Sequence, residues 1–399
     1  MLVREGYLSK LRPWYDIPDV VKVLTGVRRG GKSVILAQIQ DDLRERVPQE
    51  RIISVNFEFM ELGEFANAES LDRHVRGMIV DPSQLYYVFL DEVQEVEGFE
   101  KAVNSLRARG NMSVFISGSN SHLLGGELST YLSGRYVETR VWPLSYAESL
   151  QLRGIDQGEA TADLLNDYLR WGGMPFRFLI GESSQQGYLR DVFNSVVLRD
   201  VVQRAGVRDV VGLEAVIDFC IENLGRVMSP TSLAGYLKSM GKTLSSDAIY
   251  SYLRALDASL LLNRVRRYDL RGKRVMSTLD KYYGTDVGLM RSRRPGQGDL
   301  VENCVFVELA RRGFEVHTGT MPRAEIDFVA IKGEKPRYVQ TAYLVGDGEV
   351  ADREFGAFAG IKDNYPRYVI SMDPLPMDRD GIHHLSLAQF LLDPPPDLA

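Results

Sequence analysis

The chain has 399 residues, of which 44% are hydrophobic and 26% are charged, and its net charge is −6. These values are typical of a globular protein with two or three domains, and they exclude a polycation, so any nucleic-acid-binding surface must be local. The N-terminus has no apolar signal region and no long apolar run occurs, so we expect a cytoplasmic protein with no membrane partner.

The first expected elements are a buried strand over residues 20–24 and a helix that begins near Lys32. Between them lies Gly26-Val-Arg-Arg-Gly-Gly-Lys32-Ser33. This segment matches G-x-x-x-x-G-K-[ST], the phosphate-binding loop (P-loop) of nucleoside triphosphatases, and such a loop needs a strand before it and a helix after it. Glycines let backbone N–H groups crowd around phosphate oxygens, and the helix start adds the positive end of its dipole.

We therefore expect ATP and Mg²⁺ at this loop. Lys32 would reach the β- and γ-phosphates, and the Ser33 hydroxyl would ligate Mg²⁺. The predicted nucleotide contacts are Gly26, Val27, Arg28, Arg29, Gly30, Gly31, Lys32, Ser33, Val34 and Ser119. The alternative is a plain glycine turn, which the motif and its context together disfavour.

An apolar run over residues 85–90 ends in Asp91 and Glu92 and predicts a strand with two carboxylates at its carboxyl end. Ligands bind at the carboxyl ends of strands in open α/β sheets. Asp91 would hold the Mg²⁺ through water, and Glu92 would orient and deprotonate the attacking water. Acids at strand ends are often merely solvated, but downstream of a P-loop the pair indicates a hydrolase.

Strands and helices alternate along residues 20–140. Further expected elements are a strand over 51–57, helices over 67–80 and 99–109, and a strand over 111–117. This alternation predicts a parallel sheet covered by helices on both faces. Ser119 and Asn120 follow the last strand and would sense the γ-phosphate, cap the next helix, or do both.

Six motifs occur in order along the chain. They are the loop at 26–33, Leu90-Asp91-Glu92, Ser117-Gly-Ser-Asn120, Ser133-Gly134-Arg135, Pro143-Leu-Ser-Tyr-Ala-Glu148 and Trp171-Gly-Gly-Met-Pro175. The set resembles the AAA+-type ATPases of the archaeal and bacterial "domain of unknown function" group, close to the STAND ATPases. The resemblance covers nearly the whole chain, and the last three motifs are more specific than the P-loop. It implies an ATPase core, a winged helix and a nuclease-like C-terminal domain.

The resemblance also implies roles outside the P-loop. Arg135 resembles an arginine that neutralises charge on the γ-phosphate, in cis or from a neighbouring subunit, and otherwise it is a surface or structural arginine. The turn at residues 172–175 would approach the nucleotide or simply end a helix. Asp200 and Arg204 are spaced as an i, i+4 ion pair, with an arginine finger in trans as the alternative.

Residues 210–290 show the winged-helix pattern of helices followed by a hairpin, whose two strands are expected over residues 260–265 and 274–283. From Arg226 to Arg294 the chain carries 14 Lys and Arg against 5 Asp, a local net charge of +9. Such a cluster suits phosphate contacts, so we expect DNA as a partner. The predicted DNA-binding residues are Arg264, Arg266, Arg267, Arg271, Lys273 and Arg274. The alternative is a winged helix used for packing or oligomerisation.

The last part of the chain resembles the restriction-endonuclease-like fold. That fold needs a helix Glu, a strand Asp and then Glu-x-Lys to hold Mg²⁺ and activate water. Glu302 and Asp327 are present, but Gln340 and Ala342 stand where the acid and the lysine are needed. We therefore expect a degenerate nuclease fold kept for binding or assembly, with residual metal binding by Glu302, Glu325 and Asp327 as the alternative.

Together these patterns predict an α/β protein: a P-loop (AAA+) parallel-sheet core with a helical lid, a winged helix-turn-helix, and an α/β restriction-endonuclease-like C-terminal domain. The expected boundaries are 1–145 for the core, 146–208 for the lid, 209–294 for the winged helix and 295–399 for the last domain.

The predicted function is Mg-dependent ATP hydrolysis coupled to DNA binding, remodelling or translocation, by a homo-oligomer. Its expected catalytic residues are Glu92, Asp91, Lys32, Asn120 and Arg135. One alternative is an ATP-binding signalling switch or scaffold that acts on protein partners without DNA. Another is an ATP-dependent nuclease, which the residues at 340 and 342 disfavour.

Overall fold

The computed structural model describes residues 2–58, 67–120, 123, 127–276, 279–294, 300–322, 324–346 and 348–399. The chain forms two compact units, residues 1–142 with 258–260 and residues 143–257 with 261–399. None of the helices in the described ranges combines the length and the apolar character that a bilayer-spanning helix needs.

The first unit is built on a five-stranded sheet with the order β2-β3-β4-β1-β5, in which every neighbouring pair is parallel. Its strands are β1 (Val21–Thr25), β2 (Ile52–Asn56), β3 (Tyr86–Asp91), β4 (Met112–Gly118) and β5 (Tyr136–Arg140). Its helices are α1 (Glu5–Leu11), α2 (Lys32–Arg44), α3 (Ala68–Gly77), α4 (Phe99–Ala108) and α5 (Glu127–Leu132).

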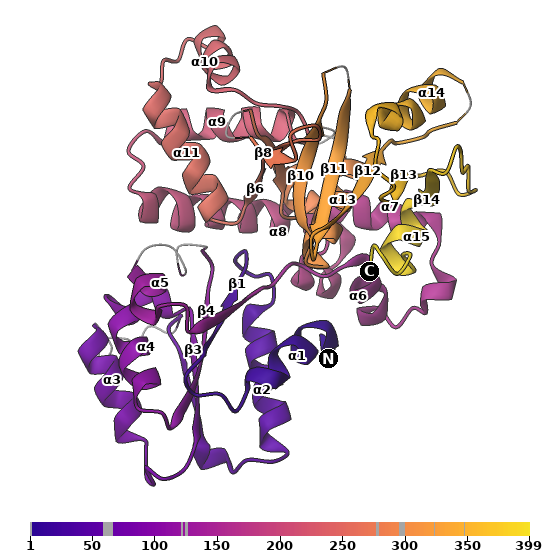
Figure 1. Ribbon diagram of the computed structural model, residues 1–399. Helices are drawn as coiled ribbons and strands as arrows, with labels where there is room; N and C mark the ends of the chain where they lie inside the picture. The colour runs from indigo at the N-terminus through magenta and orange to yellow at the C-terminus, as the bar shows by residue number, and fades with distance from the viewer. Residues whose placement is uncertain are drawn as a thin grey trace. The chain divides into compact units, whose positions relative to one another are not determined.

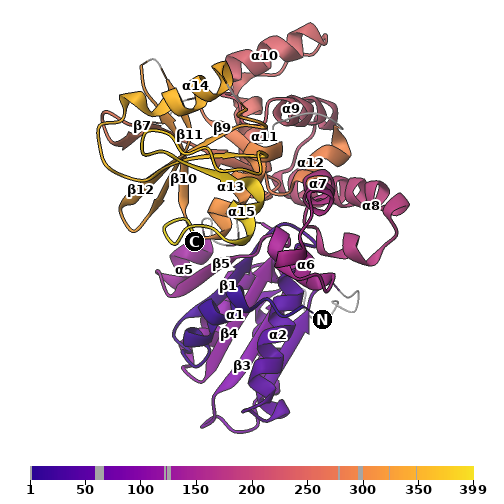
Figure 2. The same cartoon turned by 90° about the vertical axis from the view of Figure 1, so that its right-hand side faces the viewer.

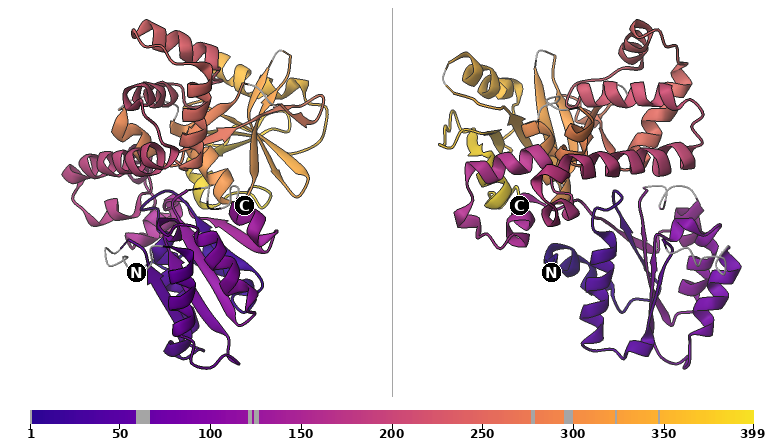
Figure 3. Two further views of the ribbon diagram at one scale, coloured as in Figure 1. Left: turned by 90° about the vertical axis from the view of Figure 1, so that its left-hand side faces the viewer. Right: turned by 180° about the vertical axis from the view of Figure 1, so that it is seen from behind.

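Two apolar clusters cover opposite faces of this sheet. Val21 and Val23 of β1 belong to the cluster that includes α3 and α4, whereas Leu24 belongs to the cluster that includes α1 and α2. Side chains alternate along a strand, so each face serves one cluster. The two helical layers lie on either side of the strands in Figure 1 and in the right-hand view of Figure 3. The expected parallel sheet, covered on both faces, is confirmed.

The second unit contains a seven-stranded mixed sheet with the order β14-β13-β12-β11-β10-β7-β8. In chain order its strands are β7 (Arg267–Asp269), β8 (Arg274–Val275), β10 (Glu315–Thr320), β11 (Glu325–Lys332), β12 (Lys335–Thr341), β13 (Arg367–Ser371) and β14 (His383–Ser386). Helix α14 (Glu349–Gly356) packs on the face of Ile326 and Val329 (Figure 2). On the other face lies α13 (Leu300–Arg311), where the Phe306 and Phe328 ring centroids are 6.4 Å apart.

The second unit has further α-helices besides α13 and α14. They are α6 (Tyr146–Leu152), α7 (Ala162–Trp171), α8 (Glu182–Ser195), α9 (Val210–Glu222), α10 (Pro230–Ser239), α11 (Ser246–Ala258), α12 (Val287–Arg293) and the C-terminal α15 (Leu387–Leu392). A π-helical segment, Val196–Gln203, extends α8. The strands β6 (Leu262–Val265) and β9 (Lys281–Gly284) pair antiparallel in a small sheet of their own.

The hairpin predicted as a wing differs from the expectation. The sequence predicted one strand over residues 274–283, but the structure divides this segment into β8 and β9. Strands β7 and β8 form a hairpin, and β7 also pairs in parallel with β10, so the hairpin is the edge of the seven-stranded sheet. Pairing with β10 satisfies backbone groups that a free-standing wing would leave to solvent.

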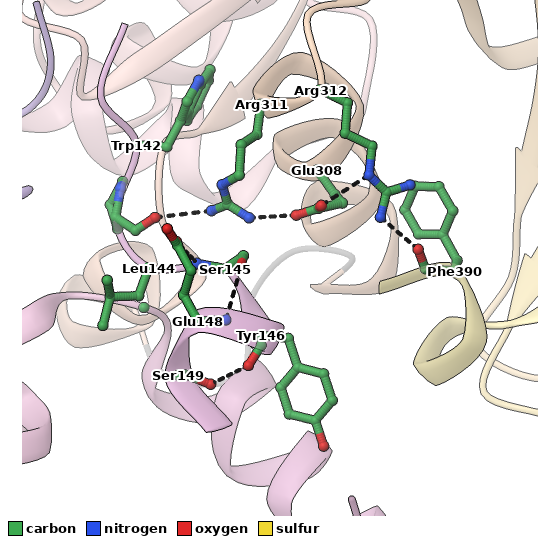
Figure 4. A network of polar contacts seen from close by, with 12 residues as sticks. Trp142, Leu144, Ser145, Tyr146, Glu148, Ser149, Glu308, Arg311, Arg312 and Phe390 are labelled. Atoms are coloured by element: carbon green, nitrogen blue, oxygen red, sulfur yellow. Dashed lines mark hydrogen bonds and ion pairs between the residues drawn. The ribbon is translucent and has the colours of Figure 1, made fainter. Parts of the chain in front are cut away.

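The motif at residues 143–148 fixes the start of α6. Ser145 N donates to Glu148 Oε2 at 2.8 Å, and Glu148 N donates to Ser145 Oγ at 3.0 Å, which makes a capping box. The Pro143 carbonyl accepts a hydrogen bond of 3.0 Å from Arg311, which is also paired with Glu308 (Figure 4). The motif therefore joins the start of α6 to the end of α13.

The Gly172-Gly173 pair ends α7 and is packed inside the second unit. Gly172 has a φ of 72°, and Gly173 N donates to the buried Asp286 carboxylate at 2.6 Å. A Cβ on Gly173 would lie 1.9 Å from the Leu144 carbonyl oxygen. These contacts support the simpler of the two interpretations of this motif, a sharp turn that ends a helix.

We predict that Gly173→Ala destabilises the second unit by about 1–3 kcal/mol or more, because the added methyl group would displace the Leu144 backbone. Gly187→Ala is the matched control, since a Cβ there meets nothing within 4 Å and Gly187 is exposed on α8. It should be neutral or stabilise by ~0.5–1 kcal/mol. Urea unfolding of wild type and both variants measures these changes in stability. Equal unfolding midpoints for Gly173→Ala and wild type would contradict the packing argument.

Candidate nucleotide-binding site

The loop between β1 and α2 has the backbone that a phosphate-binding loop requires. Gly26, Arg29 and Gly31 have positive φ values of 153°, 62° and 106°. A Cβ on Gly26 would lie 2.3 Å from the Val141 carbonyl oxygen, so the position excludes larger residues. Helix α2 begins at Lys32, directly after Gly31, and its first N–H groups face the loop with their positive dipole end.

Lys32 is buried at the centre of this loop. Its Nζ donates to the Gly26 carbonyl at 3.1 Å and lies 3.2 Å from Glu92 Oε1. The Lys32 and Glu92 side chains are only 3% and 6% exposed, so the ion pair is shielded from water. A buried charge needs such a partner, because an unpaired ammonium in the protein interior is strongly disfavoured.

Asp91 ends β3 and is held by its neighbours on both sides. The Ser117 hydroxyl of β4 donates to Asp91 Oδ1 and accepts from Glu92 N at 3.0 Å. Asn56, at the end of β2, donates to Asp91 Oδ2 at 3.3 Å. Three adjacent parallel strands therefore fix the direction of one carboxylate at their shared carboxyl edge.

Glu92 has a left-handed backbone, with a φ of 55°, and a carboxylate that faces Lys32. Gln94 Nε2 donates to Glu92 Oε2 at 2.5 Å. Burial raises the pKa of Glu92, but the positive charge of Lys32 and the hydrogen bond from Gln94 outweigh it, so the pKa lies below its ordinary value. The carboxylate is therefore ionised in this arrangement.

The other predicted contacts lie in or near the same loop. Val27 and Gly30 are buried, Arg29, Ser33 and Val34 are exposed, and Arg28 pairs with Glu58 at 2.8 Å.

Ser119 and Asn120 follow β4 and are buried at the same edge of the sheet. The helix that they were predicted to cap would begin within residues 121–126, of which the structure describes only Leu123.

Four side chains at this edge were not among the predicted residues: Arg4, Asn56, Gln94 and, as a partner of Asp91, Ser117. Arg4 is buried, donates to the Trp142 carbonyl at 3.0 Å and reaches the Gly30 carbonyl at 3.5 Å. It comes from the segment before α1, which carries no motif. The sequence showed that Asn56 and Ser117 lie near the carboxyl ends of their strands, but it did not show that both contact Asp91.

A family model described as "AAA domain" matches residues 19–150, and one described as "Domain of unknown function (DUF8612)" matches residues 162–295. An uncharacterized protein of Haemophilus influenzae is 36% identical over 399 residues, which cover 98% of this chain and 99% of that protein. This chain belongs to the same family as that protein, and it carries an AAA domain. An uncharacterized protein of Methanocaldococcus jannaschii is 28% identical to this AAA-domain protein over 370 residues, covering 87% of this chain and 80% of that one.

Solved structures that resemble the AAA-domain protein share little sequence with it. Cdc6p from Pyrobaculum aerophilum has a TM-score of 0.33 and 12% identity, and it covers 66% of this chain and 88% of its own. The Orc1 protein of Aeropyrum pernix, solved in complex with DNA, has a TM-score of 0.33 and 12% identity, with 74% and 93% covered. Scores this low do not establish a shared arrangement of whole chains.

The expectation that Arg135 contacts the γ-phosphate in cis is wrong for the AAA-domain protein. Arg135 precedes β5, and the register pairs Tyr136 with Val21 and Arg140 with Thr25. The loop follows Thr25 at the carboxyl ends of the strands, whereas Arg135 lies at their amino ends, roughly 16 Å away along the strand direction. There its guanidinium is 3.7 Å from Asp19 and its side chain is 53% exposed.

The predicted basic cluster of the AAA-domain protein is divided by the structure. Arg264 Nε donates to Asp280 at 2.6 Å, and Arg267 Nε donates to Thr320 at 3.0 Å. Arg264 is nevertheless exposed, and so are Arg266, Arg271, Lys273 and Arg274. Among the described residues, the last four have one salt bridge, at 3.9 Å from Arg274 to Asp269. Five of the six predicted basic residues are therefore exposed, although Arg264 is bound to an acid.

We predict that Arg135→Ala leaves the dissociation constant for ATP unchanged within about twofold, because a charge this far from the loop is screened. Lys32→Ala should weaken binding roughly tenfold or more, since it removes a charge-assisted contact to phosphate. A fluorescent ATP analogue measures both. A large loss of affinity in Arg135→Ala would mean that the arginine does reach the nucleotide.

Proposed function

We propose that this protein binds ATP with Mg²⁺ and hydrolyses it at the loop of residues 26–33. One observation carries the proposal: Lys32, Asp91 and Glu92 are all buried at the same edge of the first unit's sheet, with Lys32 Nζ 3.2 Å from Glu92 Oε1. A buried ammonium beside two oriented carboxylates, under a loop that excludes side chains, is what phosphoryl transfer to water requires.

The residues present fit the nucleotide and its metal ion. The glycines of the loop carry no side chains, so phosphate oxygens can approach the backbone N–H groups of the loop. Ser33 offers an exposed hydroxyl, and Asp91 offers a carboxylate whose direction is set by Ser117 and Asn56. Hydroxyl and carboxylate oxygens are the ligands that Mg²⁺ prefers, and bound Mg²⁺ would neutralise charge on the phosphates.

The Lys32–Glu92 pair suggests how binding and hydrolysis are ordered. Phosphate oxygens near Lys32 would compete with Glu92 for its ammonium group. Once Glu92 loses that positive neighbour, burial would dominate and raise the pKa of its carboxyl group. A carboxylate with a higher pKa is a better general base for the attacking water. Gln94 would keep it oriented during the exchange.

We predict that Glu92→Gln still binds ATP but hydrolyses it at least 10²-fold more slowly, because the amide cannot accept the proton of the attacking water. Glu97→Gln is the control, since Glu97 is an exposed acid close by in the chain. Steady-state phosphate release, with nucleotide affinity measured in parallel, separates the two steps. Normal turnover in Glu92→Gln would refute this mechanism.

The proposal extends to architecture and assembly. We propose the AAA+ division into core, helical lid, winged helix and restriction-endonuclease-like domain, with the boundaries given above. The hairpin β7–β8 links the last two of these, because β7 pairs with β10. In a homo-oligomer, the exposed Arg135 could act on the nucleotide of a neighbouring subunit. Arg204 is less suited to that role, because Asp200 binds it at 3.1 Å.

We further propose that hydrolysis is coupled to DNA binding. The supporting observation is the exposed hairpin that carries Arg266, Arg271, Lys273 and Arg274. Exposed guanidinium and ammonium groups close together on an edge hairpin can each contact a backbone phosphate. The alternative is a switch that acts on protein partners, for which the same charges would form an assembly surface.

We predict that duplex DNA binding weakens steeply with salt, and that reversing Arg266, Arg271 and Lys273 to Glu lowers the slope of log K against log[salt] by roughly 2–3. The control reverses three exposed basic residues elsewhere, Arg73, Lys101 and Arg190, and should keep most of the slope. Fluorescence anisotropy with single-stranded, duplex and branched DNA measures both. Salt-independent or absent binding to every DNA would favour the protein-partner switch and leave the ATPase proposal intact.

A further inference from the structure

The second unit gathers three carboxylates around one buried ammonium group. Lys281 Nζ, from β9, lies 2.7 Å from Glu325 Oε1, 3.5 Å from Glu302 Oε1 and 3.9 Å from Asp327 Oδ1. Its side chain is 3% exposed. The four residues come from three elements, β9, α13 and β11, so the cluster joins parts of the chain that are distant in sequence.

An irregularity in β11 directs the two strand carboxylates to this cluster. The pairing of β10 with β11 shifts between His317 and Gly319, where Val329 and Ile326 are their respective partners. An extra residue in β11 places Asp327 and Phe328 on the side of α13, while Ile326 and Val329 face the opposite side.

Two of the carboxylates have further partners in the protein. Tyr283 donates its hydroxyl proton to Glu302 Oε1 at 2.6 Å. Asp327 Oδ2 accepts from Thr341 N at 2.8 Å and from Thr341 Oγ1 at 2.9 Å. The Asp327 backbone N–H donates to Gln340 Oε1 at 3.2 Å, so the amide that replaces an expected acid supports the strand instead. These contacts fix the direction of the Glu302 and Asp327 carboxylates.

The charges in the cluster stabilise one another. Burial lowers the pKa of Lys281, but the negative charges of Glu302, Asp327 and Glu325 outweigh burial, so the pKa lies above its ordinary value. Burial raises the pKa of Asp327 to about 6. At neutral pH the ammonium therefore keeps its proton and serves as the counter-ion of the surrounding acids.

A divalent cation does not fit this arrangement. Mg²⁺ needs oxygens that converge on it at about 2.0–2.1 Å, and the space between these oxygens holds Lys281 Nζ. Within the described ranges, no three His, Cys, Asp or Glu side chains are grouped so that they could hold a metal ion. The metal that a restriction-endonuclease-like fold implies is thus at odds with the residues present.

We propose that the Lys281 ammonium takes the place of a divalent cation in the second unit, and that it fastens β9 to β11 and α13. If the proposed coupling to DNA holds, the second unit then binds DNA without metal-dependent cleavage. It follows that removing the lysine side chain leaves three carboxylates around one space without their counter-ion, and that a small rearrangement of these carboxylates creates a site for a divalent cation.

The test uses the full-length chain without nucleotide and Mn²⁺ as the probe, followed by electron paramagnetic resonance and thermal unfolding. Lys281→Ala should unfold at a lower temperature than wild type in EDTA, and Mn²⁺ should restore roughly 5 °C. It should also bind about one more Mn²⁺ per chain than wild type. The double variant Lys281→Ala with Asp327→Asn should show neither the extra Mn²⁺ nor the stabilisation by Mn²⁺. This result would place the new site beside Asp327.

Lys281→Met is the matched control, because it removes the charge but fills the space. It should be destabilised like Lys281→Ala and gain nothing from Mn²⁺. If Lys281→Ala folds and gains no Mn²⁺ relative to wild type, the proposal is wrong.

A second experiment uses the wild-type chain and therefore does not depend on whether a Lys281 variant folds. Wild type and Glu302→Gln should bind the same amount of Mn²⁺, and neither should cleave DNA in its presence. Binding or cleavage by wild type that Glu302→Gln removes would show that a metal enters beside Lys281 and would overturn the proposal. If the protein still hydrolyses ATP in that case, the function proposed for the first unit is unaffected.

Discussion

The first unit depends on one constraint, the parallel direction of all its strands. Because the strands run the same way, the segments that leave their carboxyl ends meet along one edge, where Asn56 lies opposite Asp91 and Gly118 lies opposite Thr25. The loop, the carboxylates and the polar residues after β4 need no other device to bring them together. The same constraint removes Arg135 from the site, since it comes before its strand and not after it.

Local patterns predicted this site well because their spacing is fixed by the chain itself. A strand, a glycine loop and a helix in succession can only place Lys32 where it is, and an apolar run that ends in Asp91 and Glu92 can only place both at a strand end. The hydrogen bonds to Asp91 could not be predicted in this way. They depend on β2 and β4 being the neighbours of β3, and the order of strands in a sheet is set by packing of the whole unit.

The second unit shows where a count of charges fails. Lys281 contributes to the local net charge of +9, yet it is buried among acids and presents nothing to a partner. Arg264 and Arg267 donate hydrogen bonds to Asp280 and Thr320, so part of their charge is used within the protein. Residues close together in sequence alternate between the two faces of a strand. Which of the β7 charges reach solvent therefore depends on how β7 pairs. It pairs with β10, which lies beyond the expected domain boundary.

The shared hairpin has a consequence for how this protein can be divided. A chain ended at residue 294 would keep β7 but lose β10, and a chain begun there would keep β10 but lose β7. Either fragment would carry a strand edge with unsatisfied N–H and C=O groups, which is the surface that recruits other chains into aggregates. A proteolytic cut between α12 and α13 would therefore leave two pieces that remain associated under native conditions, so the boundary along the sequence is no boundary for folding.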